Sequence, residues 1–271
     1  MARSVLGNKG QRLRGLLVCA HALLLLASPA FAGGQDSSSN SSTQSTSSAP
    51  PPDFLLGQPR ASIGLRGSFM KAAANSDIFD FVTENLAIDK SDFNTGSFGV
   101  EVAFSVTSML DIVGGFDVNG MSHESDYRLF EDNFGLPIQQ TTELSQLNLT
   151  VSAKFALLPR GRNVSRLAWI PRTFVPYVGA GGGYGKYHFR QNGDFVDFVD
   201  NHVFSDTFDS EGWSPTVHVL GGTDIRVYRH MIVSFEGKYS WQHADLSRDF
   251  IDFDPIDLGG FRFGAGVHLV F

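Results

Sequence analysis

Hydrophobic and polar residues alternate strictly in the stretch 261–271, which reads FRFGAGVHLVF. Such alternation predicts an extended strand, because successive side chains of a strand point to opposite faces of the sheet. The members of the apolar face are Phe261, Phe263, Ala265, Val267, Leu269 and Phe271. The opposite face carries Arg262 and His268 among small residues. We therefore expect one face of this strand to meet an apolar environment and the other to meet polar groups.

Seven further stretches alternate in the same way. The complete set is 61–69, 98–107, 112–119, 146–157, 174–189, 216–227, 233–241 and 261–271. Few residues join the second stretch to the third or the sixth to the seventh, whereas the other connections are long. Short turns at one end and long loops at the other are typical of transmembrane barrels. The pattern predicts an all-β chain, an eight-stranded antiparallel transmembrane β-barrel with short periplasmic turns and long extracellular loops. The connection 159–172 is an exception, since it is long but falls on the periplasmic side.

Composition strengthens the membrane interpretation. Charged residues make up only 18 % of the chain and phenylalanine occurs 24 times, yet the mean hydropathy is −0.05. A helical membrane protein needs runs of about 20 apolar residues, whereas barrel strands dilute the apolar signal with polar residues of the inner face. The net charge of −7 argues against nucleic-acid binding.

The N-terminal residues read as an export signal. A basic segment (Arg3 to Arg14) precedes an apolar run (Leu16 to Ala27), and small residues favour cleavage after Ala32. Lipid attachment at Cys19, the only cysteine, is disfavoured because the preceding Val18 is bulky. We expect a signal peptide over 1–32, a disordered Ser/Thr/Pro-rich linker over 33–53 in the periplasm, and the barrel domain over 54–271.

Periodicity alone does not say which face points inward. A soluble calycin-like barrel would bury its apolar face, whereas an outer-membrane barrel would expose it to lipid. In the membrane orientation a charge network fills the lumen, and its members are Arg66, Glu101, Asp117, Lys154, Asp224, Arg226, Glu236, Lys238 and Arg262. His218 and His268 share that face. An eight-stranded barrel is only wide enough for its side chains, so we expect a plugged core, with a narrow channel as the alternative.

The long connections are acidic and rich in phenylalanine. Phe–Asp repeats occur at 79–81, 194–198 and 250–254. We expect these repeats to form strand extensions or short helices that pack together, or else an adhesive or ligand-gathering surface. The densest oxygen donors are Asp249, Asp252, Asp254 and Asp257. Their spacing is not that of an EF-hand, so we expect a solvated loop without bound metal, although divalent cations remain candidate partners of these loops.

Three segments together resemble a known family. They are Val175 to Tyr184 (VPYVGAGGGY), Glu236 to Trp241 (EGKYSW) and the closing FRFGAGVHLVF. They resemble the small outer-membrane β-barrel superfamily of the OmpW, OmpX and opacity-protein type. The resemblance implies the outer membrane of a Gram-negative bacterium, with its lipids and lipopolysaccharide as partners. It also implies that Phe271 engages the barrel-assembly machinery. Members of the superfamily serve as adhesins, as stabilisers, or as channels for small apolar molecules.

One enzyme class has to be weighed, namely lipid A deacylase-like barrels, which use a His-x-Ser arrangement with a carboxylate. Here His243 precedes Ser247 by four residues rather than two, with Asp245 or Asp249 as the available acid. A serine nucleophile needs its base within hydrogen-bond reach, and this spacing does not provide it. We expect no enzyme activity, no catalytic residue and no cofactor. The leading hypothesis is a structural or surface-interaction role through the acidic–aromatic loops. The alternatives are a narrow channel or binding barrel for small, apolar solutes and, third, a lipid A-modifying enzyme.

Overall fold

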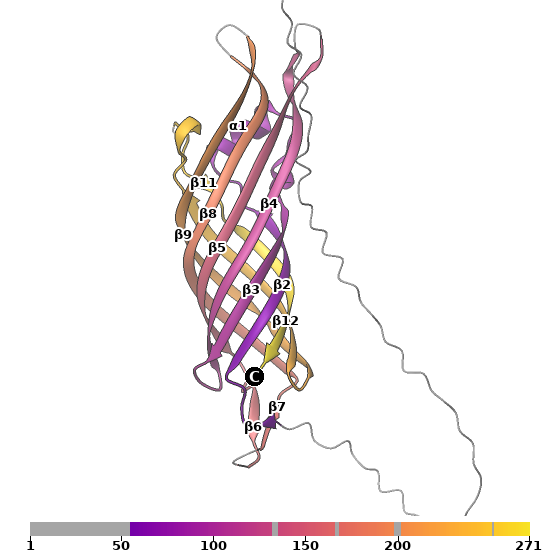
Figure 1. Cartoon of the computed structure of the whole chain (residues 1–271), viewed down its shortest axis with the longest axis vertical. Coiled ribbons are helices and arrows are strands. Elements are labelled where there is room, and N and C mark those ends of the chain that lie inside the picture. The colour runs from indigo at the N-terminus through magenta and orange to yellow at the C-terminus, as the bar shows by residue number, and fades with distance from the viewer. Residues whose placement is uncertain (1–54, 132–134, 166–167, 198–201, 251) are drawn as a thin grey trace, which may run out of the picture. The chain divides into compact units, whose positions relative to one another are not determined.

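A computed structural model describes residues 55–131, 135–165, 168–197, 202–250 and 252–271. The predicted signal peptide (1–32) and linker (33–53) lie outside these residues. Eight long antiparallel strands form a closed ring, because β12 pairs with both β10 and β2 (Figure 1). In chain order the strands are β2 (Ala61–Ala72), β3 (Thr95–Ser105), β4 (Leu110–Glu131), β5 (Pro137–Ala156), β8 (Phe174–Val196), β9 (Val203–Tyr228), β10 (Met231–Ala244) and β12 (Gly260–Val270). The predicted eight-stranded antiparallel barrel is confirmed.

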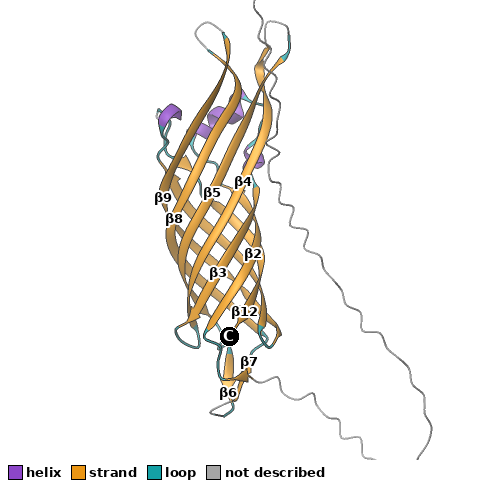
Figure 2. Cartoon of the chain, in the orientation of Figure 1, coloured by secondary structure: helices purple, strands orange, loops and turns teal. Residues whose placement is uncertain are grey.

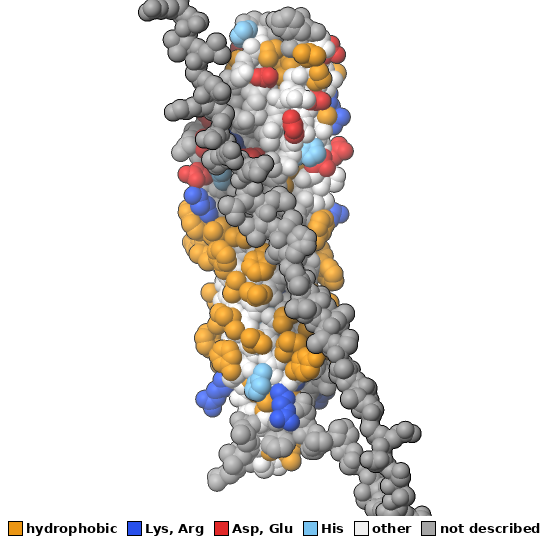
Figure 3. Space-filling view, turned by 45° about the vertical axis from the view of Figure 1, so that its right-hand side comes forward, with side chains coloured by type: hydrophobic (Ala, Val, Ile, Leu, Met, Phe, Trp, Pro, Cys, Tyr) orange, Lys and Arg blue, Asp and Glu red, His pale blue; other side chains and the backbone are white. Residues whose placement is uncertain are grey.

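The outer wall of the barrel is apolar over part of its height. Phe69 is 56 % exposed and Trp213 is 57 % exposed, although both side chains are large and apolar. Figure 3 shows such side chains gathered around the lower part of one face, with charged residues above them. The inner face of the same strands buries polar groups, which excludes the calycin-like alternative. A closed ring with an apolar exterior satisfies every strand hydrogen bond internally, as a membrane-spanning sheet requires. None of the described helices is long and apolar enough to cross a membrane.

Four neighbouring strands rise well above this apolar belt. Strands β4, β5, β8 and β9 have 22, 20, 23 and 26 residues, whereas the other four have 11 to 14. Much of the chain that we expected to form the second and third long loops is therefore strand. Within the belt the apolar side chains of β5 point outward, as Leu147 and Leu149 do, whereas above it Ile138 and Leu144 point inward. The apolar face of β5 thus changes from the outside to the inside where the strand leaves the belt. Because the alternation changes phase there, a pattern of one constant phase does not reveal the extension.

Short elements fill the space that the four short strands leave open at this end (Figure 2). They are α1 (Asp77–Asn85), the 3₁₀ helices η1 (Lys90–Phe93) and η2 (Arg248–Phe250), and β11 (Ile256–Asp257). Helix α1 buries Ile78, Phe79 and Val82, whose spacing places them on one helical face. The described residues of the Phe–Asp repeats lie in or beside α1, β8 and η2, which confirms the expected strand extensions and short helices; Phe198 and Ile251 lie outside them.

The apolar core of the molecule lies at this long-loop end. Its fully buried members include Ile78, Phe79, Val82, Leu86, Phe93, Ile138, Phe189, Ile256 and Leu258. The upper edge of β4 has no strand partner, and the chain after α1 covers it: Leu86 bridges Tyr127, and the Ala87 N–H donates to the Asp126 carbonyl at 2.8 Å. Covering a free sheet edge in this way prevents pairing with other chains.

A small sheet lies at the opposite, short-turn end. Strands β6 (Gly161–Asn163) and β7 (Ala168–Pro171) form a hairpin, and β1 (Leu55–Leu56) pairs with β7. The long connection 159–172 therefore has its own strands. Trp169 of β7 is only 4 % exposed and lines the cavity at the mouth of the barrel.

Candidate functional site

The barrel interior contains a cluster centred on Arg66 of β2. Its guanidinium bridges two carboxylates, donating to Glu101 Oε2 at 2.8 Å and forming an ion pair with Glu236. The Tyr177 hydroxyl donates to the second oxygen of Glu236 at 2.9 Å. Burying an unpaired charge is costly. Here the guanidinium and the phenol hydroxyl together provide partners for both inward-facing carboxylates.

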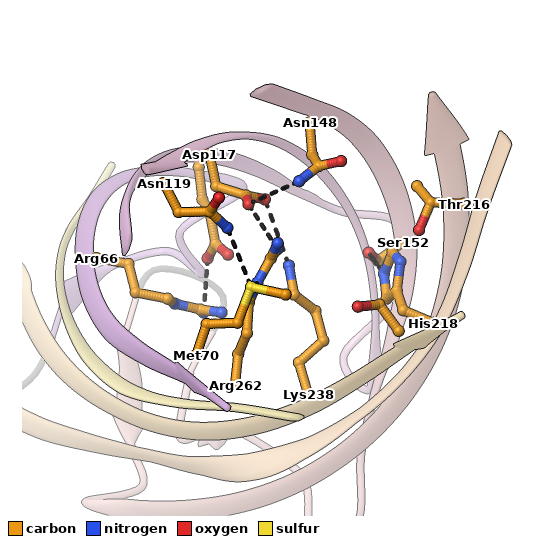
Figure 4. Close-up of polar contacts among 12 residues, drawn as sticks. Arg66, Met70, Asp117, Asn119, Asn148, Ser152, Thr216, His218, Lys238 and Arg262 are labelled. Atoms are coloured by element: carbon orange, nitrogen blue, oxygen red, sulfur yellow. Dashed lines mark hydrogen bonds and ion pairs between the residues drawn. The ribbon is translucent and has the colours of Figure 1, made fainter. Parts of the chain in front are cut away.

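A second cluster is centred on Asp117 of β4 (Figure 4). Arg262 Nη1 donates to Asp117 Oδ1 at 2.6 Å, and Lys238 Nζ lies 3.6 Å from the other oxygen. Asn148 Nδ2 also donates to Oδ1, at 3.3 Å. Arg262 in addition reaches Gln146 Oε1 at 3.4 Å. The cluster joins side chains from β4, β5, β10 and β12, so it spans the lumen rather than following one strand.

The rest of the network lies nearer the short-turn end. Lys154 Nζ donates to Asp224 Oδ1 at 3.0 Å. Arg226 donates from Nη1 to the Arg229 carbonyl at 2.6 Å, and its guanidinium lies over the Trp169 ring. Ion pairs thus join eight of the residues that the sequence placed in the lumen network, and the ninth, Arg226, is directed toward the short-turn end.

Sequence reasoning missed one ion pair in this region. Arg160 enters the barrel from the segment before β6 and pairs with Asp111, and it donates to Ser105 Oγ at 3.1 Å. No alternating pattern covers Arg160, which lies in the long connection 159–172 that the sequence predicts on the periplasmic side. The alternation along β4 places Asp111 on the inward face of the strand, so the sequence did contain a signal for this residue.

Two serine–histidine contacts also line the interior. Ser152 Oγ lies 2.7 Å from His218 Nε2, and Ser234 Oγ lies 2.9 Å from His268 Nε2. Nucleophilic catalysis uses such pairs when a third group orients the base and a substrate can reach the hydroxyl. Among the described residues no carboxylate comes within ion-pair distance of either ring. All four side chains are buried in the barrel interior.

Little space remains between these side chains. Two cavities among the clusters have volumes of about 30 and 20 Å³, and a third at the short-turn mouth has about 70 Å³. One water needs roughly 10–15 Å³ by this measure. The two inner cavities therefore hold only one or two waters each, and the apolar core lies above them.

A different kind of cavity lies at the long-loop end, between the short helices and the inner face of β8 and β9. We call it the phenylalanine cup, and its volume is about 190 Å³. Its lining is Phe81, Asn85, Leu86, Tyr127, Gln140, Gln191, Phe195, Val196, Phe204, Phe208, Asp249, Phe250 and Phe253. The rings of Phe195 and Phe208 meet edge to face with centroids 4.6 Å apart. Such apolar walls with a few polar groups are typical of small-molecule sites.

The residues weighed for lipid A chemistry are not brought together. His243 is 61 % exposed, and its nearest acid, Asp257, is 3.9 Å away. Ser247 Oγ instead contacts Ser210 Oγ and donates to the Glu211 carbonyl, both at 3.2 Å.

The acidic loop residues do not assemble into a metal centre in the described part of the chain. Asp249 accepts the Asp209 N–H at 3.1 Å, and Asp77 accepts the Asp254 N–H at 3.0 Å. No group of three His, Cys, Asp or Glu side chains among the described residues is arranged to hold a metal ion.

No protein-family model matches the chain, and no curated protein matches its sequence. Solved structures of small outer-membrane β-barrels do resemble it. Neisserial surface protein A is 11 % identical, with 78 % of this chain and 97 % of that chain covered and a TM-score of 0.45. OprG from Pseudomonas aeruginosa is 12 % identical, with 80 % and 99 % covered and a TM-score of 0.43. Ail of Yersinia pestis, solved with the heparin analogue sucrose octasulfate, is 14 % identical, with 79 % and 100 % covered and a TM-score of 0.38. The barrel assignment itself rests on the closed strand ring of this chain.

Proposed function

We propose that the chain is a non-enzymatic barrel of the bacterial outer membrane that conducts no ions and binds a small apolar molecule in the phenylalanine cup. The apolar belt and the export signal in the sequence support this location, with outer-membrane lipids and lipopolysaccharide around the belt. In this location the short-turn end faces the periplasm and the cup faces the outside of the cell.

The observation that carries the proposal is an apolar cavity placed above a filled polar lumen. A cavity of about 150 Å³ lined by Leu, Ile and Phe is known to stay dry and to bind benzene. The cup has about 190 Å³, so it accommodates a single substituted ring or a short branched chain. The ion-paired clusters below it support binding without passage through the barrel.

Binding of 4-fluorotoluene to the protein in lipid nanodiscs, followed by fluorine NMR, tests this proposal. Empty nanodiscs measure the partition of the compound into lipid. We expect saturable binding that Phe204→Asn weakens about tenfold, because the change removes apolar surface worth about 1–2 kcal/mol. Leu129→Asn is the matched control, since Leu129 is exposed at the tip of β4 outside the cup. Absence of saturable binding to the unmodified protein would overturn the proposal.

The orientation has its own test. Cys19 is the only cysteine and falls in the predicted signal peptide, so single cysteines introduced elsewhere are unambiguous labels. In intact cells an impermeant maleimide should modify an Asp206→Cys variant at the long-loop end and spare an Arg162→Cys variant in β6. The reverse pattern would contradict the proposed orientation.

A structural or surface-interaction role through the acidic–aromatic loops is the second candidate. The observation in its favour is that Leu129 and Leu136, which flank the tip of the β4–β5 extension, are 87 % and 59 % exposed. Exposed apolar side chains at the tip of a wall suit contact with another surface. If cells that carry Leu129→Ser and Leu136→Ser attach less well to another surface than cells with the unmodified protein, this role is supported. Unchanged attachment would remove it.

The absence of enzyme activity is part of the proposal and is tested separately. Ser247 and His243 make separate contacts, so Ser247→Ala should leave the acylation of lipid A in expressing cells unchanged. A change in acylation that follows this substitution would overturn the non-enzymatic proposal.

A further inference from the structure

Gln140 of β5 is a lining residue of the cup whose polar chemistry is incomplete. It is only 3 % exposed, and its Oε1 is buried without a hydrogen-bond partner among the described residues. Buried side-chain acceptors are nearly always hydrogen-bonded in folded proteins. The free carbonyl oxygen therefore requires a partner other than the described residues.

The neighbours of Gln140 indicate what kind of partner is missing. Burial raises the pKa of the Tyr127 hydroxyl, and the neighbouring Gln140 side chain partly offsets that rise. A polar group that lowers the pKa of a phenol donates to its oxygen, which favours the orientation with the NH₂ group of Gln140 toward Tyr127. The amide oxygen is then the atom without a partner, and because it is an acceptor it lacks a hydrogen-bond donor.

Neighbouring polar groups do not supply this donor. Gln191, the other glutamine of the cup, places its Nε2 3.5 Å from Thr142 Oγ1. Ser125 lies opposite Gln140 in the β4–β5 register. The Ser125 Oγ is also buried without a partner in the described part of the chain. Two buried polar groups without partners among the described residues thus lie in register on β4 and β5, and of the two Gln140 lines the cup.

We infer that the occupant of the cup is an apolar ring or short-chain molecule that carries one hydroxyl or N–H group, which donates a hydrogen bond to Gln140 Oε1. This inference rests on the proposed function and sharpens it, because it names the chemical class of the ligand. The phenylalanines provide affinity for the apolar body, and Gln140 selects for the donor. A site built to hydrogen-bond a ligand discriminates strongly against an analogue that lacks the group, since its own polar atom is then left unpaired.

Three ring compounds of similar size separate the contributions. In nanodiscs, fluorine NMR gives the affinities of 4-fluorophenol, which has a donor, of 4-fluoroanisole, which has only an acceptor, and of 4-fluorotoluene, which has neither. The variant Gln140→Leu removes the acceptor, and Gln140→Met does so with a closer match in shape. Gln139→Leu is the matched control, because Gln139 is the preceding residue and points outward from the wall.

We expect both Gln140 variants to weaken 4-fluorophenol binding about tenfold while 4-fluorotoluene binding stays within about twofold. A tenfold loss corresponds to about 1.4 kcal/mol. The control should bind all three compounds as the unmodified protein does. A gel shift on heating verifies that each variant is folded, and the Met variant provides the comparison if the Leu variant does not fold.

Equal weakening of all three compounds, or no weakening of the phenol, would overturn the role of Gln140 and leave the apolar cup intact. The unmodified protein could instead prefer the anisole over the other two compounds, and both Gln140 variants could abolish that preference. This result would show that Gln140 presents an N–H to the ligand, and it would also overturn the inference. Failure of every compound to bind the unmodified protein would overturn the proposed function itself. The two failures are therefore distinguishable.

Discussion

Arg262 on β12 donates a hydrogen bond to Asp117 on β4 at 2.6 Å, although β2 and β3 lie between these strands in the ring. Both side chains are largely buried, and Lys238 approaches the same carboxylate. The contact therefore connects two parts of the barrel wall through the lumen. Closing the ring brings the two strands to facing positions, and the charge pair then holds the interior at that width.

Replacing Asp117 with alanine should destabilise the barrel strongly. Arg262 and Lys238 would lose their shared counter-ion in a buried site, and breaking a buried pair in this way costs about 3–5 kcal/mol. Urea unfolding in lipid vesicles, read from the gel shift of the folded barrel, measures the loss. Glu211→Ala is the control, because its pair with Lys186 is about half exposed and contributes at most about 1 kcal/mol. Equal effects of the two substitutions would contradict this account.

Two glycines of β2 should respond oppositely to the same substitution. A Cβ on Gly64 would clash with Nδ1 of His268, whereas a Cβ on Gly67 would meet nothing within 4 Å. Gly64→Ala therefore displaces the imidazole and breaks its contact with Ser234, with a cost of about 1–3 kcal/mol typical of overpacking. Gly67→Ala should be neutral or slightly stabilising, because alanine restricts the unfolded chain.

The same unfolding measurement distinguishes the two variants. A His268→Ala change should relieve the cost of Gly64→Ala, since it removes the clashing ring. If the double variant is as unstable as the sum of its parts, the close approach is not the cause.

The strands within the apolar belt could be predicted because a single phase holds along each of them. The stretch 98–107 corresponds to β3, and the polar residues of the same phase led to Arg66, Asp117 and Arg262. Because the outer face contacts lipid, its side chains must be apolar, and this requirement is visible as alternation in the sequence. The partners of each charge could not be predicted, since pairs such as Arg262 with Asp117 depend on how the ring closes.

The phenylalanine cup could not be predicted for a different reason. Its walls come from α1, β8, β9 and η2, which are distant in sequence. In β8 the apolar residues from Val178 to Tyr184 point outward and those from Tyr187 onward point inward, so the alternation changes phase at the upper edge of the belt. A search that allows one change of phase at a predicted membrane boundary would have found the extension. The spatial meeting of the phenylalanines still requires the fold.

The three tryptophans should report the position of the belt. Trp213 and Trp241 face outward and are 57 % and 45 % exposed, whereas Trp169 is buried at the short-turn end. Brominated lipids should therefore quench the emission of a Trp169→Phe variant strongly. The double variant Trp213→Phe with Trp241→Phe, which retains only Trp169, should be quenched little. Strong quenching of Trp169 would place the small sheet within the lipid and contradict the belt described above.

We expect helix α1 and the charge clusters to close the barrel at two successive levels, each independently of the other. Val82→Asp places a carboxylate in the apolar core beneath α1, where an unpaired charge is costly, so the helix should detach. Protease added to the protein in nanodiscs should then cleave within 73–94. Glu84→Gln, on the exposed side of the same helix, should remain resistant.

Detachment of α1 should nevertheless open no pore, because the ion-paired clusters below it leave cavities of only about 30 and 20 Å³. In planar bilayers neither the unmodified protein nor Val82→Asp should give ion steps. Adding Lys238→Ala and Arg262→Ala to Val82→Asp removes the side chains that fill the lumen at the level of Asp117, and only this combined variant should conduct. Ion steps from the unmodified protein, or from Val82→Asp alone, would show that the charge clusters do not close the barrel.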